Sequence, residues 1–79
     1  MPRRAPVKDF GVLLGAMYKM VQEEGLSKDE AMVTLRSWLP AGELAVGVQK
    51  SLRRLDACTD DLSFLILLGQ ESLRLLDLR

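Results

Sequence analysis

The stretch from Leu62 to Leu78, LSFLILLGQESLRLLDL, constrains the fold most, because no other part of the chain is so apolar. On a helical wheel of about 100° per residue, its polar residues fall mainly in one narrow stripe. Phe64, Ile66 and the leucines occupy most of the remaining circumference, roughly 260°. A helix at a protein surface needs a much narrower apolar face. The pattern therefore predicts a helix that is covered on most sides, by other helices of the chain or by a second chain.

The small size of the chain favours association with another protein. Its 79 residues predict a single domain over 1–79, and a domain of this size buries only about 60% of the surface that its unfolded chain exposes. Cys58 is the single cysteine and histidine is absent, so we expect no internal disulfide, no metal site and no cofactor. Contact with another protein is then the remaining means of stabilisation.

The charges balance, with eleven basic and eleven acidic residues. A formal net charge of zero does not favour a bulk electrostatic attraction to nucleic acid or to an anionic membrane. The signs alternate along the chain, with residues 1–22 net positive and residues 23–43 net negative. Segments of opposite sign attract one another when they pack side by side, as neighbouring helices of a bundle do.

The first seven residues, MPRRAPV, predict a flexible basic arm over 1–7, because its two prolines disfavour a helix. Charged residues Lys8 and Asp9 precede the next apolar run and no small-residue cleavage site follows it, so this is not a typical signal peptide. We expect a cytoplasmic protein. A first helix is predicted over 8–24, where apolar residues from Phe10 to Val21 recur at three- and four-residue spacing.

Gly25 follows this helix as a left-handed cap. Gly11 and Gly15 have the G-x-x-x-G spacing that permits close helix approach, but they lie on the polar side, which indicates at most a shallow backbone contact. A capping box between Ser27 and Glu30 starts the second predicted helix, and Pro40 ends it at about residue 39.

A third helix is predicted over 43–57, with a regular apolar stripe. The stripe consists of Leu44, Val48, Leu52 and Leu55. Thr59 is the predicted N-cap of the fourth helix, with acidic residues in its first turn. Gly69 interrupts the leucines of that helix and marks either a helix crossing or a kink. The apolar run 64–68 is too short to span a bilayer, and the acidic polar face, to which we assign Glu71, does not suit a membrane anchor.

Catalytic patterns are weak in this sequence. Without histidine the usual general base is missing, and no glycine-rich phosphate loop is present. The adjacent acidic pairs at 23–24, 29–30 and 60–61 fall at predicted helix ends, where carboxylates are expected on structural grounds. We therefore expect no enzyme, no catalytic residue and no small-molecule substrate.

These observations predict an all-α fold of four helices, three amphipathic and one Leu-rich, in orthogonal or bundle-like packing. The predicted function is a protein-interaction module, homodimeric or docked on a larger protein, that acts as a regulator, inhibitor, chaperone or assembly adaptor. The predicted interface residues are Phe64, Leu65, Leu68, Leu73, Leu75, Leu76, Leu78 and Trp38. The candidate electrostatic contacts with protein or nucleic acid are Arg3, Arg4, Lys50, Arg53 and Arg54.

The alternative function is a DNA-binding regulator that dimerises through the C-terminal helix. The turn at 25–27 between two amphipathic helices resembles that of helix-turn-helix repressors, and residues 48–55 resemble the end of a recognition helix. The resemblance implies a helical fold that contacts nucleic acid. Against it, the helix after the turn begins with Asp29 and Glu30, which phosphates repel.

Overall fold

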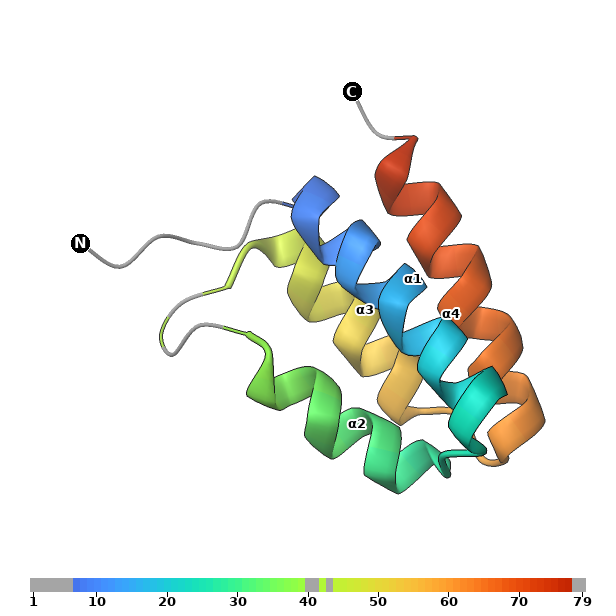
Figure 1. The fold of residues 1–79 in the computed structure, drawn as a ribbon. Coiled ribbons are helices and arrows are strands. Elements are labelled where there is room, and N and C mark those ends of the chain that lie inside the picture. The colour runs from blue at the N-terminus through green and yellow to red at the C-terminus, as the bar shows by residue number, and fades with distance from the viewer. Residues whose placement is uncertain (1–6, 40–41, 43, 78–79) are drawn as a thin grey trace.

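The computed structural model describes residues 7–39, 42 and 44–77. The described residues form four α-helices, namely α1 (Val7–Glu24), α2 (Lys28–Ser37), α3 (Val46–Asp56) and α4 (Asp61–Leu76), with no strand among them (Figure 1). The predicted all-α four-helix fold is confirmed. Of the predicted N-terminal arm, residues 1–6 lie outside the described residues and Val7 is the first residue of α1.

The turn between α1 and α2 follows the predicted local signals. Gly25 has a φ of 67°, in the left-handed region, and its N–H donates to the carbonyl of Val21 at 2.9 Å. The capping box is present: the Ser27 hydroxyl accepts from the backbone N–H of Glu30 at 3.2 Å, and the Glu30 carboxylate accepts from the backbone N–H of Ser27 at 3.4 Å. The two helices are therefore joined by a turn that fixes the end of one and the start of the other.

Two predicted helix starts are wrong. The N-cap of α4 is Asp60, not Thr59, and its carboxylate accepts from the backbone N–H of Ser63 at 2.6 Å. A carboxylate at this position also interacts favourably with the positive end of the helix dipole, and the hydrogen bond lowers the pKa of Asp60. Helix α3 begins at Val46 rather than at residue 43, and its N-cap, Ala45, has no side chain that can cap the helix.

The end of α2 also differs slightly from the prediction. The helix ends at Ser37, and Trp38 serves as its C-cap, with its backbone N–H donating to the carbonyls of Leu35 and Arg36. The indole of Trp38 is half-buried against the core.

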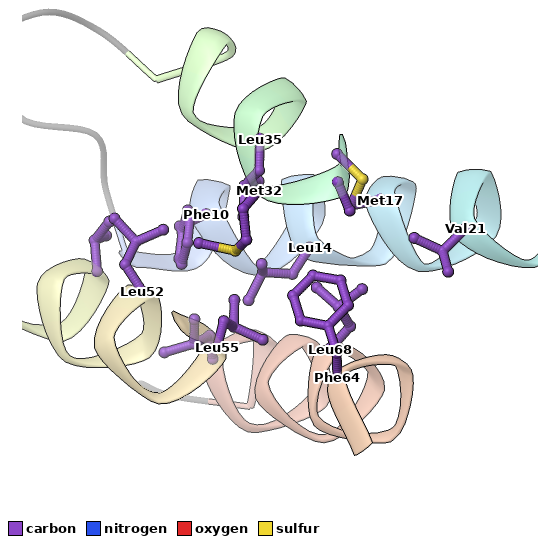
Figure 2. Close-up of a cluster of buried hydrophobic side chains, with 13 residues drawn as sticks. Phe10, Leu14, Met17, Val21, Met32, Leu35, Leu52, Leu55, Phe64 and Leu68 are labelled. Carbon is purple, nitrogen blue, oxygen red and sulfur yellow. The ribbon is translucent and has the colours of Figure 1, made fainter. Parts of the chain in front are cut away.

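All four helices contribute to one hydrophobic core, in which thirteen side chains are buried (Figure 2). The core residues are Phe10, Leu14, Met17 and Val21 of α1, Ala31, Met32 and Leu35 of α2, Val48, Leu52 and Leu55 of α3, and Phe64, Leu68 and Leu75 of α4. Their three- and four-residue spacing is that of amphipathic helices with one buried face each. The buried face of α1 lies within the predicted run from Phe10 to Val21, and three of the four residues of the stripe predicted for the third helix, Val48, Leu52 and Leu55, are buried.

The most extensive helix contact joins α1 to α4, which run side by side in opposite directions (Figure 1). Glycines make the close approach possible. A Cβ atom on Gly11 would lie 3.1 Å from Leu75 Cβ, one on Gly15 would lie 3.1 Å from the Ser72 hydroxyl, and one on Gly69 would lie 3.1 Å from the ring of Tyr18. The Gly11 and Gly15 pair is therefore a tight helix contact, and Gly69 marks a crossing within an uninterrupted helix.

A group of polar contacts joins the starts of α2 and α4 to the end of α3. The ammonium group of Lys28 donates to the carbonyls of Asp56 at 2.5 Å and Cys58 at 2.6 Å, at the end of α3. The backbone N–H of Lys28 donates to the carboxylate of Asp61 at 2.9 Å, at the start of α4. One residue thus links the starts of α2 and α4 to the end of α3, with each charge at the helix terminus that it stabilises.

No helix in the described part of the chain combines the length and the hydropathy needed to cross a bilayer.

Candidate protein-interaction surface

A stripe of exposed apolar side chains runs along the outer side of α4. Its residues, with their exposed fractions, are Leu62 (68%), Ile66 (52%), Leu73 (72%) and Leu76 (37%). On a helical wheel these four side chains and Gly69 lie within an arc of about 80°. They therefore form one continuous surface, which we call the α4 stripe. Exposed apolar side chains grouped in this way are typical of surfaces that contact another molecule.

A groove lies beside the middle of the α4 stripe, where α4 meets α1. Its volume is about 300 Å³, and it is lined by Gly15, Tyr18, Gly69, Ser72 and Leu73. The two glycines bring no side chains to it, so the floor is low where the helices cross. An apolar side chain of a partner could enter this hollow, as a knob enters a hole between four residues of a facing helix.

The hydroxyl groups beside the groove already have partners. The Ser72 hydroxyl donates to the Gly11 carbonyl at 2.7 Å across the buried helix contact. The Tyr18 hydroxyl accepts from the side-chain amide of Gln22 at 3.3 Å. The groove therefore presents mainly apolar surface to an incoming group.

The predicted interface residues separate into two groups in the structure. Phe64, Leu68 and Leu75 are fully buried in the core of the single chain. The prediction that these three residues form an interface is therefore wrong. They pack against the other three helices because that is the face which α1, α2 and α3 together enclose. Leu73 and Leu76 are on the surface, in the α4 stripe.

The remaining predicted interface residues have intermediate or undescribed positions. Leu65 and Trp38 are half-buried and pack against the core. Leu78 lies outside the described residues. The predicted interface list also missed Leu62 and Ile66. Their position on the same helical face as Leu73 was the available signal, but the breadth of the apolar pattern concealed which leucines face the chain's own core.

The opposite side of α4 contains a buried carboxylate. Glu71 is 5% exposed. It accepts from the Ser51 hydroxyl at 2.8 Å, from the guanidinium of Arg54 at 3.1 Å, and from Arg74 through two hydrogen bonds of 3.0 Å. The assignment of Glu71 to the exposed polar face of its helix is therefore wrong. Three donors from α3 and α4 compensate for the loss of water around it.

These contacts determine the protonation of Glu71. Hydrogen bonds from Arg74 are the largest cause that lowers its pKa, to about 2. Burial acts in the opposite direction, and the hydrogen bonds from Ser51 and Arg54 lower the pKa further. The same contacts raise the pKa of Arg74. Glu71 is thus ionised near neutral pH. Its hydrogen bonds hold α3 against α4, so its role is structural.

The candidate electrostatic residues are spread over different surroundings. Lys50 and Arg53 are exposed on α3. Arg54 is half-exposed and forms an ion pair with Glu71, so part of its charge is neutralised. Arg3 and Arg4 lie outside the described residues.

The other exposed large apolar residues of the described chain lie one each on α1, α2 and α3, namely Val12, Val33 and Val46. Val33 of α2 is 71% exposed, and its helix neighbours on that side, Asp29, Arg36 and Ser37, are polar and exposed. Single exposed apolar residues of this kind are ordinary. Val12 of α1 is 57% exposed, one turn of the helix before the groove residue Gly15. The grouping of apolar residues on α4, rather than exposure alone, is what identifies a candidate surface.

Chemical groups suited to ligand binding are sparse in the part of the chain that the structure describes. Within 7–39, 42 and 44–77, no group of three or more cysteine, histidine, aspartate or glutamate side chains could hold a metal ion. Cys58 is half-buried, and its thiol donates to the carbonyl of Arg54 at 3.6 Å.

Comparisons with protein-family models, with curated proteins and with solved structures found no match.

Proposed function

We propose that this chain is a small, non-enzymatic protein-interaction module that self-associates through the α4 stripe. The observation that carries the proposal is the alignment of Leu62, Ile66, Leu73 and Leu76 on one exposed face of a helix whose opposite face is in the core. Burying a fully exposed leucine contributes about 1.5–3 kcal/mol, so covering this stripe contributes several kcal/mol for each copy. The role would be that of a regulator, inhibitor, chaperone or assembly adaptor.

The polar groups of the chain support a structural rather than a catalytic use. Among the described residues, the buried carboxylate is Glu71, and it accepts hydrogen bonds from Ser51, Arg54 and Arg74. Asp60 and Asp61 accept hydrogen bonds from backbone N–H groups at helix starts. Each of these carboxylates accepts at least one hydrogen bond that holds the helices in place.

The proposal predicts that one charge in the α4 stripe abolishes association. In Leu73→Asp the carboxylate would have to be desolvated at the contact, which costs several kcal/mol without a partner. Leu73 is exposed in the single chain, so we expect the variant to stay folded. Light scattering after size-exclusion chromatography should give a dimer for the wild type and a monomer for Leu73→Asp, and circular dichroism should give the same helix content for both.

Val33→Asp is the matched control. Val33 is as exposed as Leu73, at 71% against 72%, but it lies on α2 among polar neighbours. We expect this variant to remain a dimer. A wild type that is monomeric at high concentration, or a dimer that both substitutions leave intact, would contradict the proposal.

A further inference from the structure

We propose that the basic side chains where α3 meets α4 form a binding site for a phosphate group, held by Arg54 and Arg74 with Lys50 beside them. We call these three residues the basic cluster. The cluster lies on the side of α4 that faces α3, whereas the α4 stripe lies on the outer side. The inference therefore goes beyond the proposed self-association and does not depend on it.

The carboxylate of Glu71 holds two guanidinium groups next to each other. Nη1 of Arg54 and Nη2 of Arg74 lie 3.1 Å and 3.0 Å from the same oxygen, Oε1 of Glu71. Nε of Arg74 donates to the other oxygen at 3.0 Å, which fixes the plane of that guanidinium. Two cations this close would repel each other without the carboxylate between them. The fold thus sets the positions of both groups before a ligand arrives, which lowers the entropic cost of binding.

Both guanidinium groups also face solvent. The side chains of Arg54 and Arg74 are 50% and 45% exposed. Within the described residues, Arg54 donates through Nη1, and Arg74 donates through Nε and Nη2. A guanidinium carries five N–H donors, so Nε and Nη2 of Arg54 and Nη1 of Arg74 can donate to a ligand. Pairs of N–H groups in this planar geometry bind oxyanions through charge-assisted hydrogen bonds.

Lys50 adds a third positive charge at the same place. It is exposed and lies four residues before Arg54, on the same face of α3. Its neighbour in sequence is Ser51, whose hydroxyl accepts from Nη2 of Arg74 at 3.3 Å. Lys50 is therefore level with Arg74 along the contact between the two helices. An ammonium group on a flexible stem can reach an anion bound there.

The charge of the cluster matches that of a phosphate monoester. Its three positive charges and the one negative charge of Glu71 leave an excess of two positive charges. Other acidic residues do not reduce this excess, because Asp56 is paired with Arg36 and Asp77 lies on the side of α4 that points away from α3. A phosphate monoester carries about −1.5 to −2 charges at neutral pH and three acceptor oxygens. A single carboxylate would neutralise only half of the excess.

A titration with inorganic phosphate tests the site. Amide chemical shifts of the wild type are recorded by NMR at neutral pH, with sodium chloride replaced by phosphate at constant ionic strength so that general screening does not change. We expect saturable shifts at the amides of residues 50–54 in α3 and 71–74 in α4.

Substitutions in α3 separate a site from a general effect of charge. Arg54→Ala and Lys50→Ala should each weaken phosphate binding by at least about threefold, because each removes a charge-assisted contact. Arg54→Ala should stay folded, since Glu71 keeps its hydrogen bonds from Ser51 and Arg74. Circular dichroism checks the helix content of both variants.

Arg53→Ala is the matched control. It removes the same charge from an exposed position of α3, but residue 53 lies about 160° from Ser51 on the helical wheel, away from α4. The phosphate affinity of this variant should equal that of the wild type. The same loss in Arg53→Ala as in Arg54→Ala would overturn the site, and so would wild-type shifts that do not saturate.

A peptide with one phosphoserine, compared with the same peptide with serine, distinguishes the source of the phosphate group. Tighter binding of the phosphopeptide than of inorganic phosphate would assign the group to a partner protein, and weaker binding would assign it to a free phosphate compound; the site stands in both cases. The outcomes are also separate from those of the proposed function. A monomeric wild type that binds phosphate would overturn the self-association alone, and a dimer without saturable phosphate binding would overturn the site alone.

Discussion

The two long sides of α4 differ in an unexpected way. On the side that faces α3, the charged residue Glu71 is buried, whereas on the outer side the apolar residue Leu73 is largely exposed. The difference shows that burial along this helix follows the available partners rather than polarity. Ser51, Arg54 and Arg74 make Glu71 stable inside the fold, while no element within the described residues covers Leu73.

The geometry of the four helices explains this arrangement. Helix α4 packs most extensively on α1, and it also contacts α2 and α3, so its inner face is fully used. The glycines that bring α1 close to α4 leave a shallow groove instead of side chains at the edge of that contact. The leucines beyond this edge then lack a partner in the same chain.

Two leucines of α4 that are only two residues apart should differ most in their contribution to the free energy of unfolding. Leu75 is fully buried and Leu73 is largely exposed. Leu75→Ala removes core packing and should lower the free energy of unfolding by about 2–5 kcal/mol. Leu73→Ala should change it by less than about 0.5 kcal/mol when the protein is dilute enough to be monomeric. Urea denaturation of both variants measures the difference.

The effect of Leu73→Ala on stability should also depend on the protein concentration. Leu73→Ala should become destabilising relative to the wild type once the wild type associates, because only the dimer buries this side chain. Equal losses for the two substitutions in dilute solution would mean that Leu73 belongs to the core of the single chain.

Glu71, on the side of α4 that faces α3, should make the free energy of unfolding depend on pH, with a smaller effect than that of Leu75→Ala. Because the pKa of Glu71 in the folded chain is lowered to about 2 from an ordinary value of 4.5, its stabilising contribution is fully present above about pH 5. The contribution is lost as the pH falls through this interval, since protonation removes the charge that Arg74 and Arg54 bind. With the guanidinium groups half-exposed to solvent, we expect a loss of about 2 kcal/mol between pH 5 and pH 2.

Glu71→Gln is the control for this titration. The amide keeps the size of the side chain but does not ionise, so the unfolding free energy of the variant should fall less steeply over the same pH range. Thermal or urea unfolding measured from pH 2 to pH 7 gives both curves. Parallel curves for the wild type and the variant would show that Glu71 does not have the lowered pKa.

Local signals in the sequence predicted much of the fold. The capping box at Ser27 and Glu30 and the left-handed Gly25 depend only on neighbouring residues, so the sequence contains the information for them. The buried faces of the first three helices also follow from their periodicity. The N-cap at Asp60 was missed because Thr59 and Asp60 are both good capping residues, and the choice depends on the backbone conformation that the fold imposes.

Features that depend on contacts between distant residues were harder to predict. Glu71 has its burial compensated by Ser51 and Arg54 of another helix, and this pairing has no signature in a linear pattern. Gly11 is required where α1 crosses α4, far away in sequence. On α4 itself, apolar residues cover so much of the circumference that periodicity could not separate core residues from the exposed stripe.

The most direct test of the account is the concentration dependence of thermal unfolding. If two copies cover each other's α4 stripe, the unfolding temperature of the wild type should rise steadily when the protein concentration is increased about a hundredfold, and that of Leu73→Asp should not change. An unfolding temperature of the wild type that is constant over this range would contradict the claim that the stripe is covered by a second copy.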